Sequence, residues 1–147
     1  MADFTEWEIA LRTAMLADVT FAGLLGDAQQ FYEAGQAENP VYPIAIWKTT
    51  RLGRVQLDRG GRKYRPDISI SFFATNPQIA RNLAEYAGNK FRIPDAGFSL
   101  QLTTTNWRVD EFICADVMDG GPSRVMNDGT VIHEFVTDWR ALVYQRT

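Results

Sequence analysis

The chain has 147 residues, of which 46% are apolar and 12% aromatic, so residues 1–147 are expected to form one domain with a substantial core. Its net charge is −3 and its isoelectric point is near 5.1, so it has no overall basic field to hold a nucleic acid. No apolar run approaches the roughly 18 residues of a membrane span, and the acidic start MADFTEWEIALR is unlike a signal peptide. We therefore expect no membrane contact and a protein that stays in the cytoplasm where it is made.

Two helical segments are predicted near the N-terminus. Thr5 and Glu8 have the spacing of a capping box, and the apolar residues that follow keep helical spacing, which predicts a helix over 6–17. A short helical segment is predicted over 19–25. The segment 27–43 contains two prolines and little periodicity, which predicts an extended loop.

The middle of the chain predicts two strands joined by an arm. The first strand covers 44–50, and the second has alternating apolar residues up to residue 74. The connection RLGRVQLDRGGRKYRP predicts a long hairpin arm with its turn near Gly60 and Gly61.

Asn76 and Pro77 are typical of a helix start, with asparagine as the N-cap and proline at the first helical position. An alanine-rich apolar stripe follows at helical spacing and predicts about four turns that end between Gly88 and Ile93. We expect this helix to lie across the sheet and to bury its stripe there.

The remaining residues predict strands. One covers 98–104, and a long hairpin is predicted from 107–117 and 131–144, joined by the loop DGGPSRVMNDG. On the outward face of the last strand Ile132, Val136 and Leu142 alternate with charged residues, and such a half-apolar face suggests contact with another subunit.

The predicted fold class is therefore α+β. It has a mostly antiparallel sheet with one long helix packed across it, an N-terminal helix and a protruding β-hairpin arm, in the order α–β–β–α–β–β–β.

The residues that could carry chemistry are few. Cys114 is the single cysteine, which excludes an internal disulfide and predicts a buried strand residue. The single histidine, His133, is predicted in mid-strand, which disfavours a catalytic triad. Asp116, Asp119 and Asp128 surround the last hairpin loop, where turn chemistry is favoured over a Ca²⁺ or Mg²⁺ site. We predict no catalytic residue, cofactor or metal. The alternatives are a small hydrolase or transferase using His133 with Cys114 or an aspartate, and a monomeric ligand-binding domain with a deep apolar pocket.

The hairpin arm carries a distinctive charge pattern. Six of the 15 basic residues and one of the 18 acidic residues lie in 51–65, which leaves nine basic and 17 acidic residues elsewhere. A basic arm on an acidic body is self-complementary between copies, although it could also contact phosphate or an acidic partner, or be a solvated hairpin. The predicted subunit or partner contacts are Arg51, Arg54, Asp58, Arg59, Arg62, Lys63, Asp119, Arg124 and Asp128.

Four segments carry a resemblance to a known family: ALRTAMLADVTFAGLLGD, NPVYPIAIW, ISISFFATNPQIARNLAEYAGNKF and DVMDGGPSRVMNDGTVIHEFVTDWRALV. In order of elements, size and turn placement, nearly the whole chain resembles the tail terminator (tail completion) proteins of long-tailed bacteriophages. The resemblance implies a structural protein without catalytic residues, which forms a six-membered homo-oligomeric ring on the tail tube and halts its polymerisation.

The resemblance also implies where such a ring lies and what it contacts. Its place is the head-proximal end of the tail in the virion, where it joins the tail to the neck of the head. The implied partners are other copies of itself, the tail tube protein and a neck or head-completion protein, with DNA passing only transiently through the lumen. The alternative is a head-closure or head–tail adaptor protein of the same junction.

Overall fold

The computed structural model describes residues 5–26, 30–34, 40–51, 54–55, 62–94, 98 and 102–146. Its elements, in chain order, are α1 (Thr5–Leu16), α2 (Val19–Leu24), β1 (Gln30–Glu33), β2 (Ile44–Arg51), β3 (Arg54–Val55), β4 (Lys63–Tyr64), β5 (Asp67–Ala74), α3 (Pro77–Lys90), β6 (Leu102–Thr103), β7 (Trp107–Val125) and β8 (Val131–Gln145).

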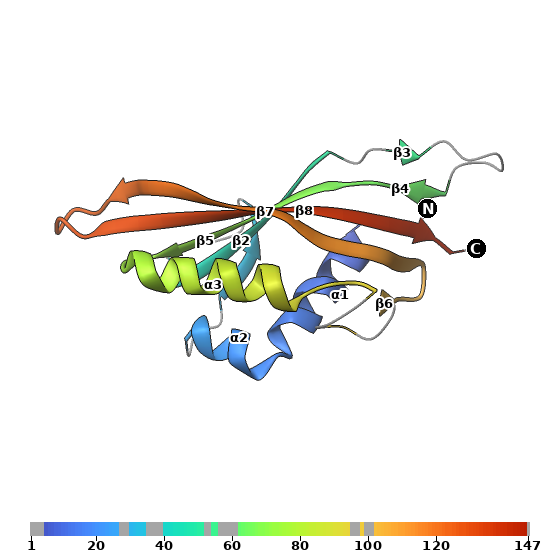
Figure 1. The fold of residues 1–147 in the computed structure, drawn as a ribbon, viewed down its shortest axis with the longest axis horizontal. Helices are drawn as coiled ribbons and strands as arrows, with labels where there is room; N and C mark the ends of the chain where they lie inside the picture. Colours follow the sequence, from blue (N-terminus) through green and yellow to red (C-terminus); the bar gives the residue numbers. More distant parts are fainter. Residues whose placement is uncertain are drawn as a thin grey trace.

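The strands form one eight-stranded sheet, which confirms the predicted α+β class. The hydrogen-bonded order is β1-β2-β5-β8-β4-β3, and β7 pairs with β8 and β6. Every pair is antiparallel except β1 with β2. All three helices lie on one side of the sheet (Figure 1). In the part of the chain that the structure describes, no helix has the length and apolarity to cross a membrane.

The long helix α3 forms as its sequence predicts. Asn76 is the N-cap, and its Oδ1 accepts a hydrogen bond from the backbone N–H of Gln78 at 2.8 Å. The alanine-rich stripe is buried against β5, β7 and β8. Because these side chains are small, the helix lies close to the sheet: a Cβ added to Gly88 would lie 3.1 Å from the sulfur of Cys114.

The core on the helix side of the sheet is organised around stacked aromatic rings. The ring centroid of Phe112 lies 4.3 Å from that of Trp139 and 6.0 Å from that of Trp47, with nearly parallel planes. The indole N–H of Trp139 donates to the hydroxyl of Thr137 at 2.7 Å, and this hydroxyl donates to the carbonyl of Ile70 at 2.9 Å. The polar atoms of this part of the core are therefore paired, as burial requires.

Helix α1 begins at Thr5, and Glu8 takes a role that its predicted place in a capping box did not suggest. Its carboxylate is buried against β2, where it accepts a hydrogen bond from the indole N–H of Trp47 at 2.7 Å and another from the hydroxyl of Thr49. Burial raises the pKa of Glu8 above its ordinary value.

Three predictions about loops and strands are wrong in part. The segment 27–43 contains β1, which pairs in parallel with β2 and so has no adjacent hairpin partner to reveal it. The strand predicted over 98–104 reduces, in its described residues, to β6. The loop predicted after residue 117 is largely strand, because β7 continues to Val125.

The irregular pairing of β7 explains why its second half has the composition of a loop. Its pairing with β8 shifts register at four places, and such bulges use the same residue types as turns. At one of them Gly121 has φ 73° and its N–H donates to the carboxylate of Asp119 at 2.7 Å. The DGGPS part of the predicted loop is thus a bulged stretch of a continuing strand.

The predicted hairpin arm begins as paired strands. Arg54 lies opposite Tyr64 and Val55 opposite Lys63, and β4 pairs with β8 beyond Arg140, the partner of Asp67 at the start of β5. The turn predicted near Gly60 and Gly61 lies outside the described residues.

Candidate assembly surfaces

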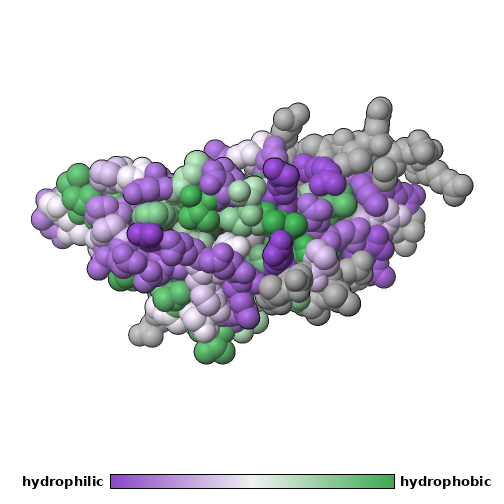
Figure 2. All heavy atoms as spheres, in the orientation of Figure 1, coloured by the Kyte–Doolittle hydropathy of each residue, from purple (hydrophilic) through white to green (hydrophobic). Residues whose placement is uncertain are grey.

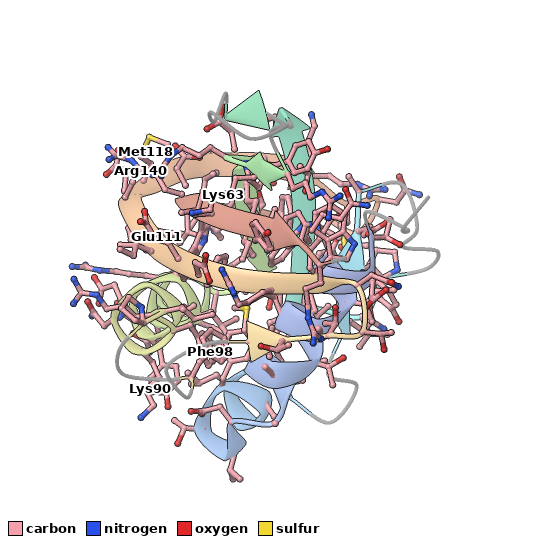
Figure 3. The ribbon with its side chains drawn as sticks, turned by 90° about the vertical axis from the view of Figure 1, so that its right-hand side faces the viewer. Lys63, Lys90, Phe98, Glu111, Met118 and Arg140 are labelled. Carbon is pink, nitrogen blue, oxygen red and sulfur yellow. The ribbon has the colours of Figure 1, made fainter. Side chains whose placement is uncertain are left out.

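The sheet has an outer face, opposite the helices, whose composition follows from strand register. Directly paired residues point to the same face, so Ile46, Ser71, Val136 and Met118 form one row across β2, β5, β8 and β7. In Figure 3 Met118 and Arg140 lie on the upper left, away from α1 and α2. The outward direction predicted for Val136 is confirmed by this register.

The outer face holds an apolar groove at the end near the turn between β7 and β8. It has a volume of about 270 Å³. Ile44 and Ile132 are 2% and 1% exposed, yet both lie outside the aromatic core on the helix side. The groove is lined by Pro40, Tyr42, Ile44, Ile46, Phe73, Ser123, Arg124 and Ile132.

The other half of the outer face is charged. The row next to Ile46 contains Lys48, Ser69, Asp138 and Asp116, in which the two aspartates are direct cross-strand partners. In the following row Asp67 pairs with Arg140. Like charges opposite each other repel, so this half of the face is suited to contact with solvent or with a basic partner. The apolar groove lacks this pair of like charges.

A second apolar surface is the hairpin tip, residues 125–130, at the end of β7 and β8. Val125 is 67% exposed and Met126 37% exposed. The turn is closed by a hydrogen bond from the N–H of Met126 to the carbonyl of Thr130 at 2.8 Å. The tip projects beyond α3 at the left of Figure 1, and a green apolar patch lies among polar residues at the same end in Figure 2.

Charge at the hairpin tip is set by the turn. The Oδ1 of Asp128 accepts the backbone N–H of Thr130 at 2.9 Å, and this bond lowers the pKa of the Asp128 carboxyl. Asp128 is therefore negatively charged at neutral pH. The carboxylates of Asp119 and Asp128 each accept a hydrogen bond from the backbone N–H two residues later, as in the turn chemistry that we predicted in preference to a cation site.

The described members of the predicted contact set form two groups at opposite ends of the molecule. Arg51 ends β2, Arg54 begins β3, Arg62 precedes β4 and Lys63 begins it; β3 and β4 lie at the right of Figure 1. Arg62 is exposed. The other described members, Asp119, Arg124 and Asp128, lie in β7 and in the hairpin turn at the left. Asp58 and Arg59 lie outside the described residues.

Sequence reasoning missed the β2 and β5 side of the groove. Ile44 and Ile46 belong to the run IAIW, which is apolar on both faces of the strand and so does not show which residues point outward. Arg124 is a predicted contact residue, but its place at the rim of the groove was not predicted. The signal that could have found the groove is the outward position of Ile132 on β8 together with a doubly apolar strand.

The structure separates His133 from Cys114, one of the pairs that the enzymatic alternative requires. Cys114 pairs with Trp139 on β8, six residues from His133, a separation of roughly 20 Å along a strand. Burial raises the pKa of the Cys114 thiol, which disfavours the nucleophilic thiolate. Among the described residues no group of three histidine, cysteine or acidic side chains is placed to hold a metal ion.

Comparison with known proteins finds similarity to solved structures. The chain matches no protein-family model, and no curated protein matches its sequence. A chain in the solved structure of the virion of a native gene transfer agent particle is similar over 93% of each chain, with a TM-score of 0.68 and 16% sequence identity. At this identity the similarity shows a shared fold along nearly the full length of both chains.

Proposed function

We propose that this protein is a virion structural protein that forms a ring on the end of a phage-type tail tube. The single observation that carries the proposal is the fold shared over 93% of both chains with a component of a gene transfer agent virion. The tail-terminator resemblance in the sequence supports the same role. In this role the ring stops polymerisation of the tube and provides the surface that joins the tail to the neck.

The distribution of charge supports a ring. A closed ring requires unlike surfaces on each subunit, which meet head to tail. Strands β3 and β4, where the basic arm begins and ends its described part, lie at the opposite end of the molecule from the hairpin tip (Figure 1), and the residues outside 51–65 carry 17 acidic against nine basic side chains. An acidic ring interior would let DNA pass without lasting phosphate contacts.

The direct test is a tail-tube polymerisation assay with and without the purified protein. We expect shorter tubes of uniform length, each with a ring at one end in negative-stain images. Tubes that grow to the same length with bare ends would contradict the proposal. Binding only to a portal-side complex would instead assign the protein to the head-closure or adaptor role.

The contribution of the arm is tested separately by the triple change Arg54→Glu, Arg59→Glu and Arg62→Glu. Because it reverses three charges of the basic end, we expect rings to be weakened or lost while the helix-side core keeps the fold. Rings that form normally in mass photometry would exclude the arm as a subunit contact.

A further inference from the structure

Two apolar surfaces lie at the same end of the molecule: the apolar groove, in which the half-buried Tyr42, Ile46 and Phe73 lie beside the buried Ile44 and Ile132, and the exposed hairpin tip. Strand β5 ends at Ala74, opposite His133, so beyond this point β7 and β8 pair only with each other in the described chain. An isolated two-stranded hairpin is only marginally stable in water. A hairpin that projects with Val125 and Met126 exposed is therefore expected to pack against another surface.

We propose that the hairpin tip of one copy packs into the apolar groove of a second copy. This deepens the proposed function by naming the surfaces of one subunit contact, and it rests on that function for the closure of such contacts into a ring. Val125 supplies a rigid branched side chain, and Met126 a flexible one that adapts to an irregular groove.

Charge at the two surfaces is complementary. Arg124 is exposed at the rim of the groove, and Asp128 is exposed at the hairpin tip and ionised. Neither side chain takes part in an ion pair with another described residue. When the tip of one copy enters the groove of another, the carboxylate of Asp128 approaches the guanidinium of Arg124, which selects this docking over a like-charged one.

The size of the groove favours side chains as its occupant. Its volume of about 270 Å³ lies just below the roughly 300–1,000 Å³ of small-molecule sites. Its lining is mainly apolar, and the charged group, Arg124, lies at the rim. A few apolar side chains with one acidic neighbour match this surface, and the chain presents that combination at residues 125–128.

Charge reversal with mixing provides the test. In Arg124→Glu alone, every tip–groove contact places the carboxylate of Asp128 against the introduced carboxylate, and in Asp128→Arg alone every contact places two guanidinium groups together. We expect each variant by itself to associate at least about tenfold more weakly than the wild type, because like charges meet. In an equal mixture, the tip of the Asp128→Arg variant can pack against the groove of the Arg124→Glu variant, where the charges are again opposite. The reverse contact keeps the wild-type charges, so we expect the mixture to assemble.

Two matched variants control for folding and for general charge effects. Asp128→Asn keeps the acceptor for the N–H of Thr130 but removes the charge, so it should weaken association less than Asp128→Arg. Arg92→Glu makes the same change as Arg124→Glu at an exposed site outside the groove lining and should assemble as the wild type does. Thermal unfolding checks that all variants are folded.

A photo-crosslinking residue in place of Met126 locates the contact. We expect a crosslinked dimer whose linked peptide contains Tyr42, Ile46 or Phe73, whereas the same probe in place of Lys90, on the helix side, should not link to these residues (Figure 3). The association of wild-type and variant proteins is measured both for the free proteins and for the proteins added to tail tubes. The comparison uses the condition in which the wild type assembles.

The outcomes separate the contact from the function. Three outcomes overturn the proposed contact. The wild type assembles neither free nor on tubes, a charge-reversed variant assembles by itself as well as the wild type does, or the mixture of the two variants does not regain assembly. Variants that each cap tubes as the wild type does reject the contact and keep the function. A mixture that recovers assembly but never caps tubes keeps the contact and rejects the function.

Discussion

The two faces of the sheet are both partly apolar, but only one is covered by the chain's own helices. On the helix side Trp47, Phe112 and Trp139 are stacked and at most 2% exposed. On the outer face Ile46 and Met118 belong to the same sheet, yet no described helix lies over them. From this difference we expect the apolar residues of the helix side to serve folding, and the partly exposed ones of the outer face, such as Ile46 and Met118, to serve association. Substitutions should therefore separate stability from assembly.

The largest expected effect is on the helix-side face. Trp139→Ala removes the 4.3 Å stacking contact with Phe112 and should lower the free energy of unfolding by about 3–5 kcal/mol, measured by urea denaturation. Met118→Ala on the outer face is the matched control and should change it by less than about 0.5 kcal/mol. Equal losses at the two sites would remove the distinction between the faces.

A smaller effect is expected from the buried hydroxyl beneath the stack. Thr137→Val keeps the shape of the side chain but leaves the indole N–H of Trp139 and the carbonyl of Ile70 without this partner. We expect a loss of about 1–3 kcal/mol in the free energy of unfolding. Thr103→Val, at an exposed strand position, should be nearly neutral. An unchanged unfolding midpoint for Thr137→Val would show that the hydrogen bonds contribute nothing net.

The buried carboxylate of Glu8 gives the helix-side face a pH dependence. Because burial raises its pKa in the folded state, the folded protein binds this proton more tightly than the unfolded chain does. The contribution of Glu8 to stability is thus fully present below its ordinary value of 4.5 and is lost as the pH rises through the folded-state pKa. Glu8→Gln keeps a hydrogen-bond acceptor without the charge, so its stability relative to the wild type should increase with pH across this window. Parallel stability curves for the two proteins would refute the assignment.

The smallest effect on stability is expected at the hairpin tip. Val125→Ser should change the free energy of unfolding by less than about 0.5 kcal/mol, because the side chain is mostly exposed. The same change should weaken self-association, measured by sedimentation, because it removes apolar area from the proposed contact. A stability loss as large as that of Thr137→Val would mean that the tip packs within its own chain.

Much of the fold follows from local signals in the sequence. The start of α3 is set by Asn76 and Pro77, and its buried face by the alanine-rich stripe, so both can be predicted. The alternation along β5 likewise predicts which residues face the core. Such features depend on a few neighbouring residues and on a regular period.

Other features depend on contacts distant in the sequence and were not predicted. Strand β1 is only four residues long and gains its partner across a long connection. The second half of β7 uses Gly121 and Pro122 within a bulged strand, so its composition is that of a loop. For the candidate surfaces, the charged residues and the outward side of Ile132 are predictable from sequence, whereas the groove requires the register of β2, β5 and β8.

The most direct test of an assembling outer face is hydroxyl-radical footprinting of free protein and of protein on capped tail tubes. Oxidation of methionine follows its exposure, so Met126 and Met118 report on the outer surfaces and Met15, which is fully buried, is an internal reference. We predict that Met126 and the groove residue Tyr42 lose reactivity on assembly while Tyr86, on the helix side, keeps it. Protection of Tyr86 with no change at Met126 and Tyr42 would contradict the account.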